Sequence, residues 1–161
     1  MGSTVILGID PGLANTGWGV IKADHSKNRA LAYGCLSTAA GSERCQRLNS
    51  IHQGLWDVIE RFAPVELAVE AVYFGVNAKS ALLTGEARGV ALLAAAQGSM
   101  SVSEYSPTQV KQVVTGNGYA KKSQIQYMVK AFLQLDHLPQ PDHAADALAV
   151  AICHAQMRRL N

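Results

Sequence analysis

The spacing of apolar and turn-forming residues predicts three strands in the first part of the chain. The apolar run 5–9 is followed by a Pro-Gly turn, and two further strands are expected at 16–23 and 30–38. The polar residues 24–29 join the last two of these strands. Strands that follow one another through such short links predict an antiparallel meander.

Further along the chain, apolar residues recur at helical spacing and alternate with short runs typical of strands. In the segment 42–62 they form one stripe that stops before Pro64, and Ser106 with Pro107 is a favourable helix start. We predict helices at 42–62, 80–97, 107–114, 122–135 and 142–160, and strands at 65–72 and 99–105. This order predicts a mixed α/β sheet with helices on both faces.

Length and charge indicate the number of domains but do not by themselves identify the function. The chain has 161 residues, 48% of them hydrophobic, which suits one compact domain spanning 1–161. A formal net charge of +2 is too small to indicate a nucleic-acid-binding protein by itself. Six basic residues nevertheless gather in the C-terminal third, which suits a phosphate-binding face there: Lys111, Lys121, Lys122, Lys130, Arg158 and Arg159.

Cysteine usage and the lack of a leader pattern predict a cytoplasmic protein. Cys35, Cys45 and Cys153 are odd in number and far apart, and no CxxC pair offers a zinc site, so reduced thiols are expected. No charged segment followed by an apolar one resembles a signal peptide. The most apolar segment, 81–96, contains two charges and is too short to cross a bilayer, so no membrane partner is predicted.

Three acids occupy positions where an apolar residue is otherwise expected. Asp10 ends the first strand, Glu70 lies deep in the fourth, and Asp146 lies a full turn inside the last helix. A carboxylate in such surroundings must be solvated, paired or bound to a cation, because burying it alone is costly. Asp10 could instead cap the turn that follows it, and Glu70 could be a structural residue at a sheet edge. We favour metal ligation for both.

Two further candidate ligands precede Asp146 on the same face of the last helix. His143 lies three residues before it and Asp142 four residues before it. Asp142 directly follows Pro141, so it is well explained as a charge that stabilises the helix start. Carboxylates, with or without an imidazole, suit Mg²⁺ or Mn²⁺. Two such ions can activate a water and stabilise the leaving oxygen of a phosphodiester.

The loop and the helix that follow the fourth strand carry residues suited to contacts beyond the chain. Tyr73 and Phe74 could anchor the core or stack on an unpaired base, and the sequence favours neither. The helix contains small residues four apart, Ala81, Gly85 and Gly89. Each glycine costs about 1 kcal/mol of helix propensity against alanine. Close approach of another backbone, from a second subunit or from the chain's own sheet, is expected to offset that cost.

Four ordered segments carry a resemblance to a known family. They read LGIDPGLANTGWGVI, AVEAVYFGVNAKSALLTGEARG, PTQVKQVVTGNGYAKKSQIQ and DHAADALAVAICHA, and together they extend nearly from end to end. The chain resembles the bacterial RuvC-type Holliday junction resolvases of the RNase H-like nuclease superfamily. The resemblance implies a sheet with three antiparallel strands followed by parallel ones. It also implies an endonuclease that resolves four-way DNA junctions by paired, metal-dependent phosphodiester hydrolysis during recombination and repair.

The resemblance further implies a catalytic set. Asp10, Glu70 and Asp146 would be ligands of Mg²⁺ or Mn²⁺, with two ions per site. The family's position three residues before the last Asp is commonly an acid, whereas this chain has His143. That side chain would either ligate a metal or shuttle a proton, and Asp142 is a less suitable substitute because it is out of register.

Residues that contact DNA and protein partners are implied in the same way. Lys111 and Lys122 would lie near the scissile phosphate, and Tyr73 beside the centre of the junction. Lys121 completes the predicted DNA-binding set. The protein would be a homodimer that cooperates with the RuvA and RuvB branch-migration proteins.

Two other classes of protein share some of these features. An acidic turn after a strand also begins actin-like and sugar-kinase-like ATPases, but these need a second phosphate-binding domain, for which this chain is too short. A catalytically silent junction-binding module would tolerate the loss of acids that only repel DNA, yet all three acids are present. Another RNase H-like nuclease activity is the remaining alternative. Cleavage of a synthetic four-way junction that depends on a divalent metal ion would distinguish these alternatives.

Overall fold

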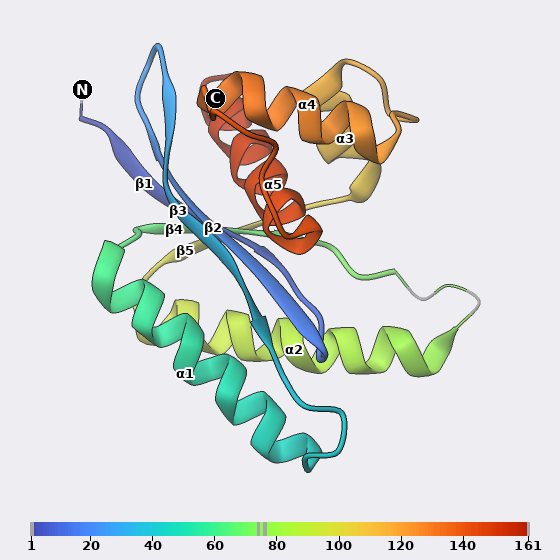
Figure 1. Ribbon diagram of the computed structural model, residues 1–161. Helices are drawn as coiled ribbons and strands as arrows, with labels where there is room; N and C mark the ends of the chain where they lie inside the picture. Colours follow the sequence, from blue (N-terminus) through green and yellow to red (C-terminus); the bar gives the residue numbers. More distant parts are fainter. Residues whose placement is uncertain (1, 74, 76, 161) are drawn as a thin grey trace.

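A computed structural model describes residues 2–73, 75 and 77–160, and its centre is a five-stranded sheet (Figure 1). The strand order is β3-β2-β1-β4-β5, in which β1, β2 and β3 are antiparallel while β4 is parallel to both β1 and β5. This confirms the expected mixed sheet. The strands are β1 Thr4–Asp10, β2 Asn15–Ala23, β3 Asn28–Ser37, β4 Glu66–Glu70 and β5 Ser101–Tyr105.

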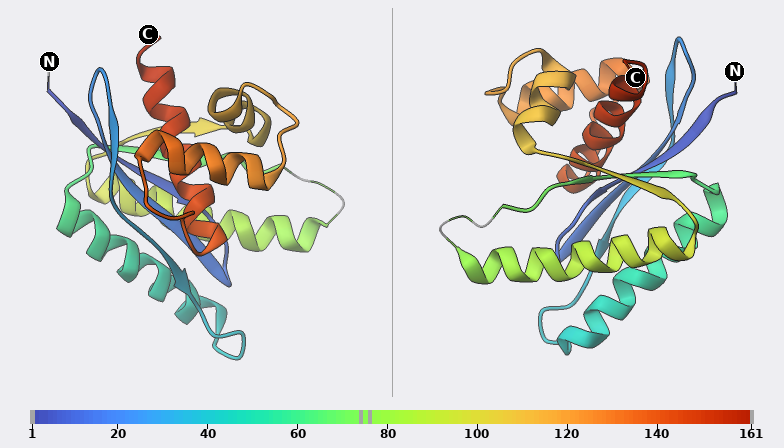
Figure 2. Two further views of the ribbon diagram at one scale, coloured as in Figure 1. Left: turned by 45° about the horizontal axis from the view of Figure 1, so that its top comes forward. Right: turned by 180° about the vertical axis from the view of Figure 1, so that it is seen from behind.

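Helices cover both faces of the sheet (Figures 1 and 2). On one face lie α1 (Arg44–Phe62) and α2 (Ala78–Gln97), and on the other lies α5 (Asp142–Arg158). The shorter helices α3 (Pro107–Thr115) and α4 (Lys122–Leu133) pack against α5 on its outer side. Within the described part of the chain, no helix is long and apolar enough to cross a membrane.

Alternate residues of the central strands enter two separate cores. In β1, Ile6 packs on the α5 side, whereas Leu7 and Ile9 pack on the side of α1 and α2. This is the two-residue period of a strand with both faces covered. Asp10 therefore lies on the same face as Ile6, toward α5.

Several predicted boundaries are shifted, and local hydrogen bonds explain why. α2 begins at Ala78, two residues earlier than expected, because the Asn77 side chain accepts a hydrogen bond from Ser80 N at 3.1 Å and caps the helix. β5 begins at Ser101 because Ser99 belongs to the turn after α2 and has a φ of 55°. The start of α3 is confirmed: Ser106 Oγ accepts from Gln109 N at 3.0 Å.

Glycines allow α5 to lie directly on the sheet. A Cβ atom at Gly17 in β2 would lie 1.9 Å from the backbone oxygen of His143, and one at Gly8 in β1 would lie 2.1 Å from that of Ala147. Neither position can hold a side chain without displacing helix backbone. Direct backbone contact therefore sets the distance between the first two turns of α5 and the strands.

Candidate active site

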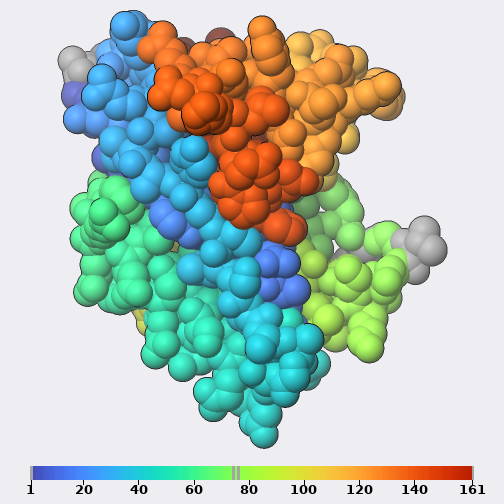
Figure 3. All heavy atoms as spheres, in the orientation of Figure 1, coloured from blue at the N-terminus to red at the C-terminus, as the bar shows by residue number. Residues whose placement is uncertain are grey.

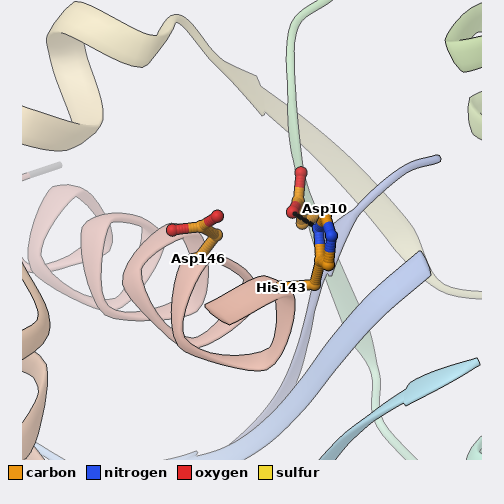
Figure 4. A group of neighbouring side chains, drawn as sticks. All are labelled: Asp10, His143 and Asp146. Carbon is orange, nitrogen blue, oxygen red and sulfur yellow. Dashed lines mark hydrogen bonds and ion pairs between the residues drawn. The ribbon is translucent and has the colours of Figure 1, made fainter. Parts of the chain in front are cut away.

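Three of the predicted ligands, Asp10, His143 and Asp146, form one group (Figure 4). Asp10 lies at the end of β1, while His143 and Asp146 come from the first two turns of α5. One ligand atom from each lies within 4.8 Å of those of the other two. His143 Nδ1 is 3.0 Å from Asp10 Oδ2.

The turn after β1 is held without any help from the Asp10 carboxylate. Thr16 is completely buried, and its Oγ1 donates to Gly12 O at 2.6 Å and accepts from Gly12 N at 3.3 Å. Among the described residues, the recorded side-chain hydrogen bond of Asp10 goes to His143. The turn-cap explanation of Asp10 is therefore not supported, and its carboxylate is directed toward α5.

Glu70 lies beside this group rather than within the 4.8 Å set. It ends β4, an inner strand between β1 and β5, which removes the sheet-edge explanation. Glu70 and Asp10 line a hollow of about 420 Å³, and Glu70 and Asp146 line an adjoining hollow of about 290 Å³. Asp10, Glu70 and Asp146 thus line two hollows that have Glu70 in common, whereas His143 lines neither of them.

Burial and mutual repulsion make this a site that disfavours negative charge in the absence of a cation. The pKa of Glu70 is raised to about 7, first by burial and then by the charges of Asp10 and Asp146. Burial also raises the pKa of Asp10 and of Asp146, although a hydrogen bond from His143 acts in the opposite direction on Asp10. Carboxylate oxygens with one imidazole fit Mg²⁺ or Mn²⁺.

Two of the predicted lysines border the acids. Lys122 Nζ lies 3.4 Å from Asp146 Oδ2 and 3.4 Å from Asp142 Oδ2. Burial alone would lower the pKa of Lys122, but these two carboxylates raise it overall. Lys111 lines the same hollow, and its charge lowers the pKa of Glu70. Lys121 is exposed next to Lys122 and is not among the residues lining that hollow.

The loop after β4 also lines the site. Tyr73 is 65% exposed and lines the hollow that contains Asp10 and Glu70, so it is not a core anchor. The prediction for Phe74 falls outside the described residues.

Sequence reasoning missed the polar residues of α2 that line the first hollow. Asn77, which caps the helix, lines the hollow together with Ser80 and Thr84, at spacings of three and four that place them on one side of the helix. The sequence signal that could have identified them is this helical spacing of polar residues directly after a strand that carries an acid. Residues of these types are too common at helix starts to be singled out without the geometry.

Comparison with known proteins identifies the family. The family model described as crossover junction endodeoxyribonuclease RuvC matches residues 6–154. The chain belongs to this family. It is 53% identical to the RuvC of Desulforamulus reducens, covering 94% of this chain and 93% of the relative. It is 52% identical to the RuvC of Moorella thermoacetica, covering 94% of this chain and 90% of the relative.

A solved structure of a RuvC protein is similar over almost the whole chain. Thermus thermophilus RuvC in complex with Holliday junction substrate has a TM-score of 0.93 and 37% identity, covering 98% of this chain and 96% of that one. Membership of the RuvC family confirms the resemblance found in the sequence. It also excludes the alternative of an actin-like or sugar-kinase-like ATPase.

Proposed function

We propose that this chain is a structure-selective endodeoxyribonuclease that resolves four-way DNA junctions by divalent-metal-dependent phosphodiester hydrolysis. The observation that carries the proposal is the convergence of Asp10, His143 and Asp146, with Glu70 beside them, in a member of the RuvC family. Thermus thermophilus RuvC, with a very similar fold, was solved with a Holliday junction substrate.

Asp10, Glu70, His143 and Asp146 would hold one or two Mg²⁺ or Mn²⁺ ions. Such ions supply an activated water and stabilise the leaving oxygen. His143 is close enough to Asp10 to orient its carboxylate, and its ring is also close enough to Asp10 and Asp146 to act as a ligand instead. The raised pKa values of Glu70 and Asp146 support this assignment, because a bound cation would stabilise carboxylates whose charge is disfavoured by burial and by neighbouring acids.

Lys111 and Lys122 would position the phosphate at the acidic site. Both line the hollow that contains Glu70 and Asp146, so they provide positive charge where the DNA backbone must approach. Lys122 is paired with Asp142 and Asp146 in the free protein. A bound metal would neutralise Asp146 and leave the ammonium group available to a phosphate oxygen.

A homodimer is supported by the outer face of α2. Leu82 is 56% exposed and Leu93 is 54% exposed, and they lie on the same face as Gly85 and Gly89. A Cβ atom at either glycine would meet nothing within 4 Å, so the chain's own sheet is not what these glycines approach. An apolar stripe with two open glycines suits close packing of a second copy, and a two-fold dimer would match a four-way junction.

The test is cleavage of a synthetic four-way junction compared with a linear duplex of the same sequence, with and without Mg²⁺. We expect paired nicks in the junction alone, and none with the Asp146→Asn variant. Metal-independent binding without any cutting would instead identify a silent junction-binding module. Cooperation with RuvA and RuvB is proposed from membership of the RuvC family, and a cytoplasmic location from the DNA substrate.

A further inference from the structure

One long segment of the chain is entirely free of acids. From Tyr105 to Leu135 there are four lysines and no Asp or Glu, in a chain that has 12 acids in all. The segment forms the end of β5 and then α3 and α4, which lie together on the outside of α5 (Figures 1 and 2). Lys111 and Lys122 line the active-site hollow, so Lys121 and Lys130 supply the positive charge of this outer layer, which has no acid of its own and suits a polyanion.

Two aromatic side chains are exposed on this layer without a role in the core. Tyr119, in the turn between α3 and α4, is 93% exposed, and Tyr127 on α4 is 66% exposed. α4 buries Ile125 and Val129 toward α5, so Tyr127 lies on the opposite, outward face. Figure 3 shows α4 forming part of the outer surface of the molecule.

The turn that carries Tyr119 is held in place by hydrogen bonds. Gln112 Nε2 donates to Gly116 O at 3.1 Å, and its Oε1 accepts from Gly118 N at 3.0 Å. Tyr119 N donates to Asn117 Oδ1 at 2.9 Å. The ring of Tyr119 is thus held out from a structured turn, and its exposure is not the result of a loose chain end.

α4 leads away from the candidate active site. It begins at Lys122, whose ammonium lies 3.4 Å from Asp146, and Lys130 lies eight residues further along. At about 1.5 Å per residue this is a separation of roughly 12 Å. The base-pair rise of DNA is about 3.4 Å, so this separation corresponds to roughly three or four base pairs of an arm.

We propose that Tyr119, Tyr127 and Lys130 form a contact surface for the phosphate backbone of one duplex arm of the junction, a few base pairs from the cut. This inference rests on the proposed function. Lys130 supplies the charge, and the two hydroxyls donate hydrogen bonds to phosphate oxygens, which position DNA without reading its sequence. An acidic protein partner would also match the charge, but the continuity with the active site favours DNA.

The test is a double-mutant cycle between protein charge and DNA charge. Lys130→Gln is combined with junctions that carry neutral methylphosphonate linkages about three to six base pairs from the crossover. Each change alone is expected to weaken binding roughly eightfold at about 0.1 M salt, the counterion-release contribution of one phosphate contact. Together they are expected to weaken it hardly further, because both remove the same contact. The salt slope of Lys130→Gln is expected to fall by about one.

Two controls isolate the contact. Arg61→Gln removes an exposed charge on α1, on the opposite face of the sheet, and should leave affinity unchanged. Methylphosphonates at the far end of the arm should not couple to Lys130→Gln. The double variant Tyr119→Phe with Tyr127→Phe keeps both rings and removes both hydroxyls, and it should weaken binding to the natural junction several-fold.

The inference would be overturned if the losses of binding free energy in the cycle were additive. It would also be overturned if Lys130→Gln bound the junction as tightly as Arg61→Gln. Cutting of the unmodified junction by the wild-type protein with Mg²⁺ is measured in the same series. If that cutting is present and the losses are additive, only the arm contact is wrong. If wild-type cutting is absent, the proposed function fails, and the arm contact fails with it.

Discussion

His143 Nδ1 lies 3.0 Å from Asp10 Oδ2, so one hydrogen bond joins residues that are 133 positions apart in the chain. It connects the end of the first strand to the first turn of the last helix. Since an imidazole is a softer ligand than a carboxylate, the choice of metal should depend on this residue.

We expect His143→Asp to shift the metal preference from Mn²⁺ toward Mg²⁺. The ratio of cleavage rates with the two ions, at saturating metal, measures this shift. The matched control is His25→Asp, which introduces the same change in an exposed turn. An unchanged Mn²⁺/Mg²⁺ ratio in His143→Asp would remove the ligand role and leave His143 as a partner of Asp10.

Glu70→Gln should reduce the cleavage rate by orders of magnitude, because the amide keeps the shape of the side chain but loses the negative ligand. Junction binding should persist or become tighter, since repulsion of phosphate decreases. Single-turnover cleavage and binding anisotropy separate the two effects. Near-normal cutting by this variant under saturating Mg²⁺ would show that the ligand assignment is wrong.

Cleavage should increase as the pH rises from 6 to 8 at subsaturating Mg²⁺. The pKa of Glu70 in the metal-free protein is about 7, so below that pH its carboxyl is mainly protonated and cannot bind a cation. Above that pH, the Glu70 carboxylate, which is the form that binds a cation, already predominates. High Mg²⁺ should move the transition to lower pH, because metal and proton compete. A rate that is flat across this range at low Mg²⁺ would contradict the competition.

The glycine contact under α5 predicts a selective loss of activity. In Gly17→Ala the new Cβ meets the His143 backbone, and overpacking of this kind costs about 1–3 kcal/mol. The start of α5 must then move away from β2, which separates His143 from Asp10. We expect a lower melting temperature and a larger loss of cutting than of junction binding. Gly41→Ala is the control, since a Cβ there meets nothing within 4 Å.

The outer face of α2 gives a prediction about subunit number. Gly85→Leu should separate the subunits or change their spacing, because a bulky side chain is added to the stripe that contains Leu82 and Leu93. We expect a folded monomer by sedimentation and single nicks in place of paired ones. A wild-type protein that is monomeric and still makes paired nicks at low concentration would exclude the dimer.

The sheet and its acids could be predicted because they follow short-range rules. An apolar run that ends in Asp10 and alternation along β4 determine which side chains face α5. Hydrogen-bonded caps shifted the helix boundaries by only a few residues. The sheet-edge alternative for Glu70 is excluded because its strand is internal, while its role as a metal ligand stays a prediction.

Contacts between distant segments could not be predicted from the sequence. The pairing of Lys122 with Asp142 depends on how α4 packs on α5, and no local pattern encodes that packing. The hydrogen bonds of His154, a buried one to Tyr105 OH at 2.7 Å and a partly buried one to Glu66 Oε2 at 2.7 Å, could not be predicted for the same reason. An isolated histidine in an apolar helix gives no sign of partners on two other strands.

The distance along the chain between Asp10 and His143 has a consequence for biosynthesis. At about 5–20 residues per second, a ribosome needs roughly 7–27 s to make the 133 residues that separate them. In the later part of that time the emerging polypeptide contains Asp10 and Glu70 but not yet the imidazole and carboxylate of α5. If His143 and Asp146 are metal ligands as proposed, a partly made chain should be unable to cut DNA, and cutting should begin only when the last helix has been released and docked.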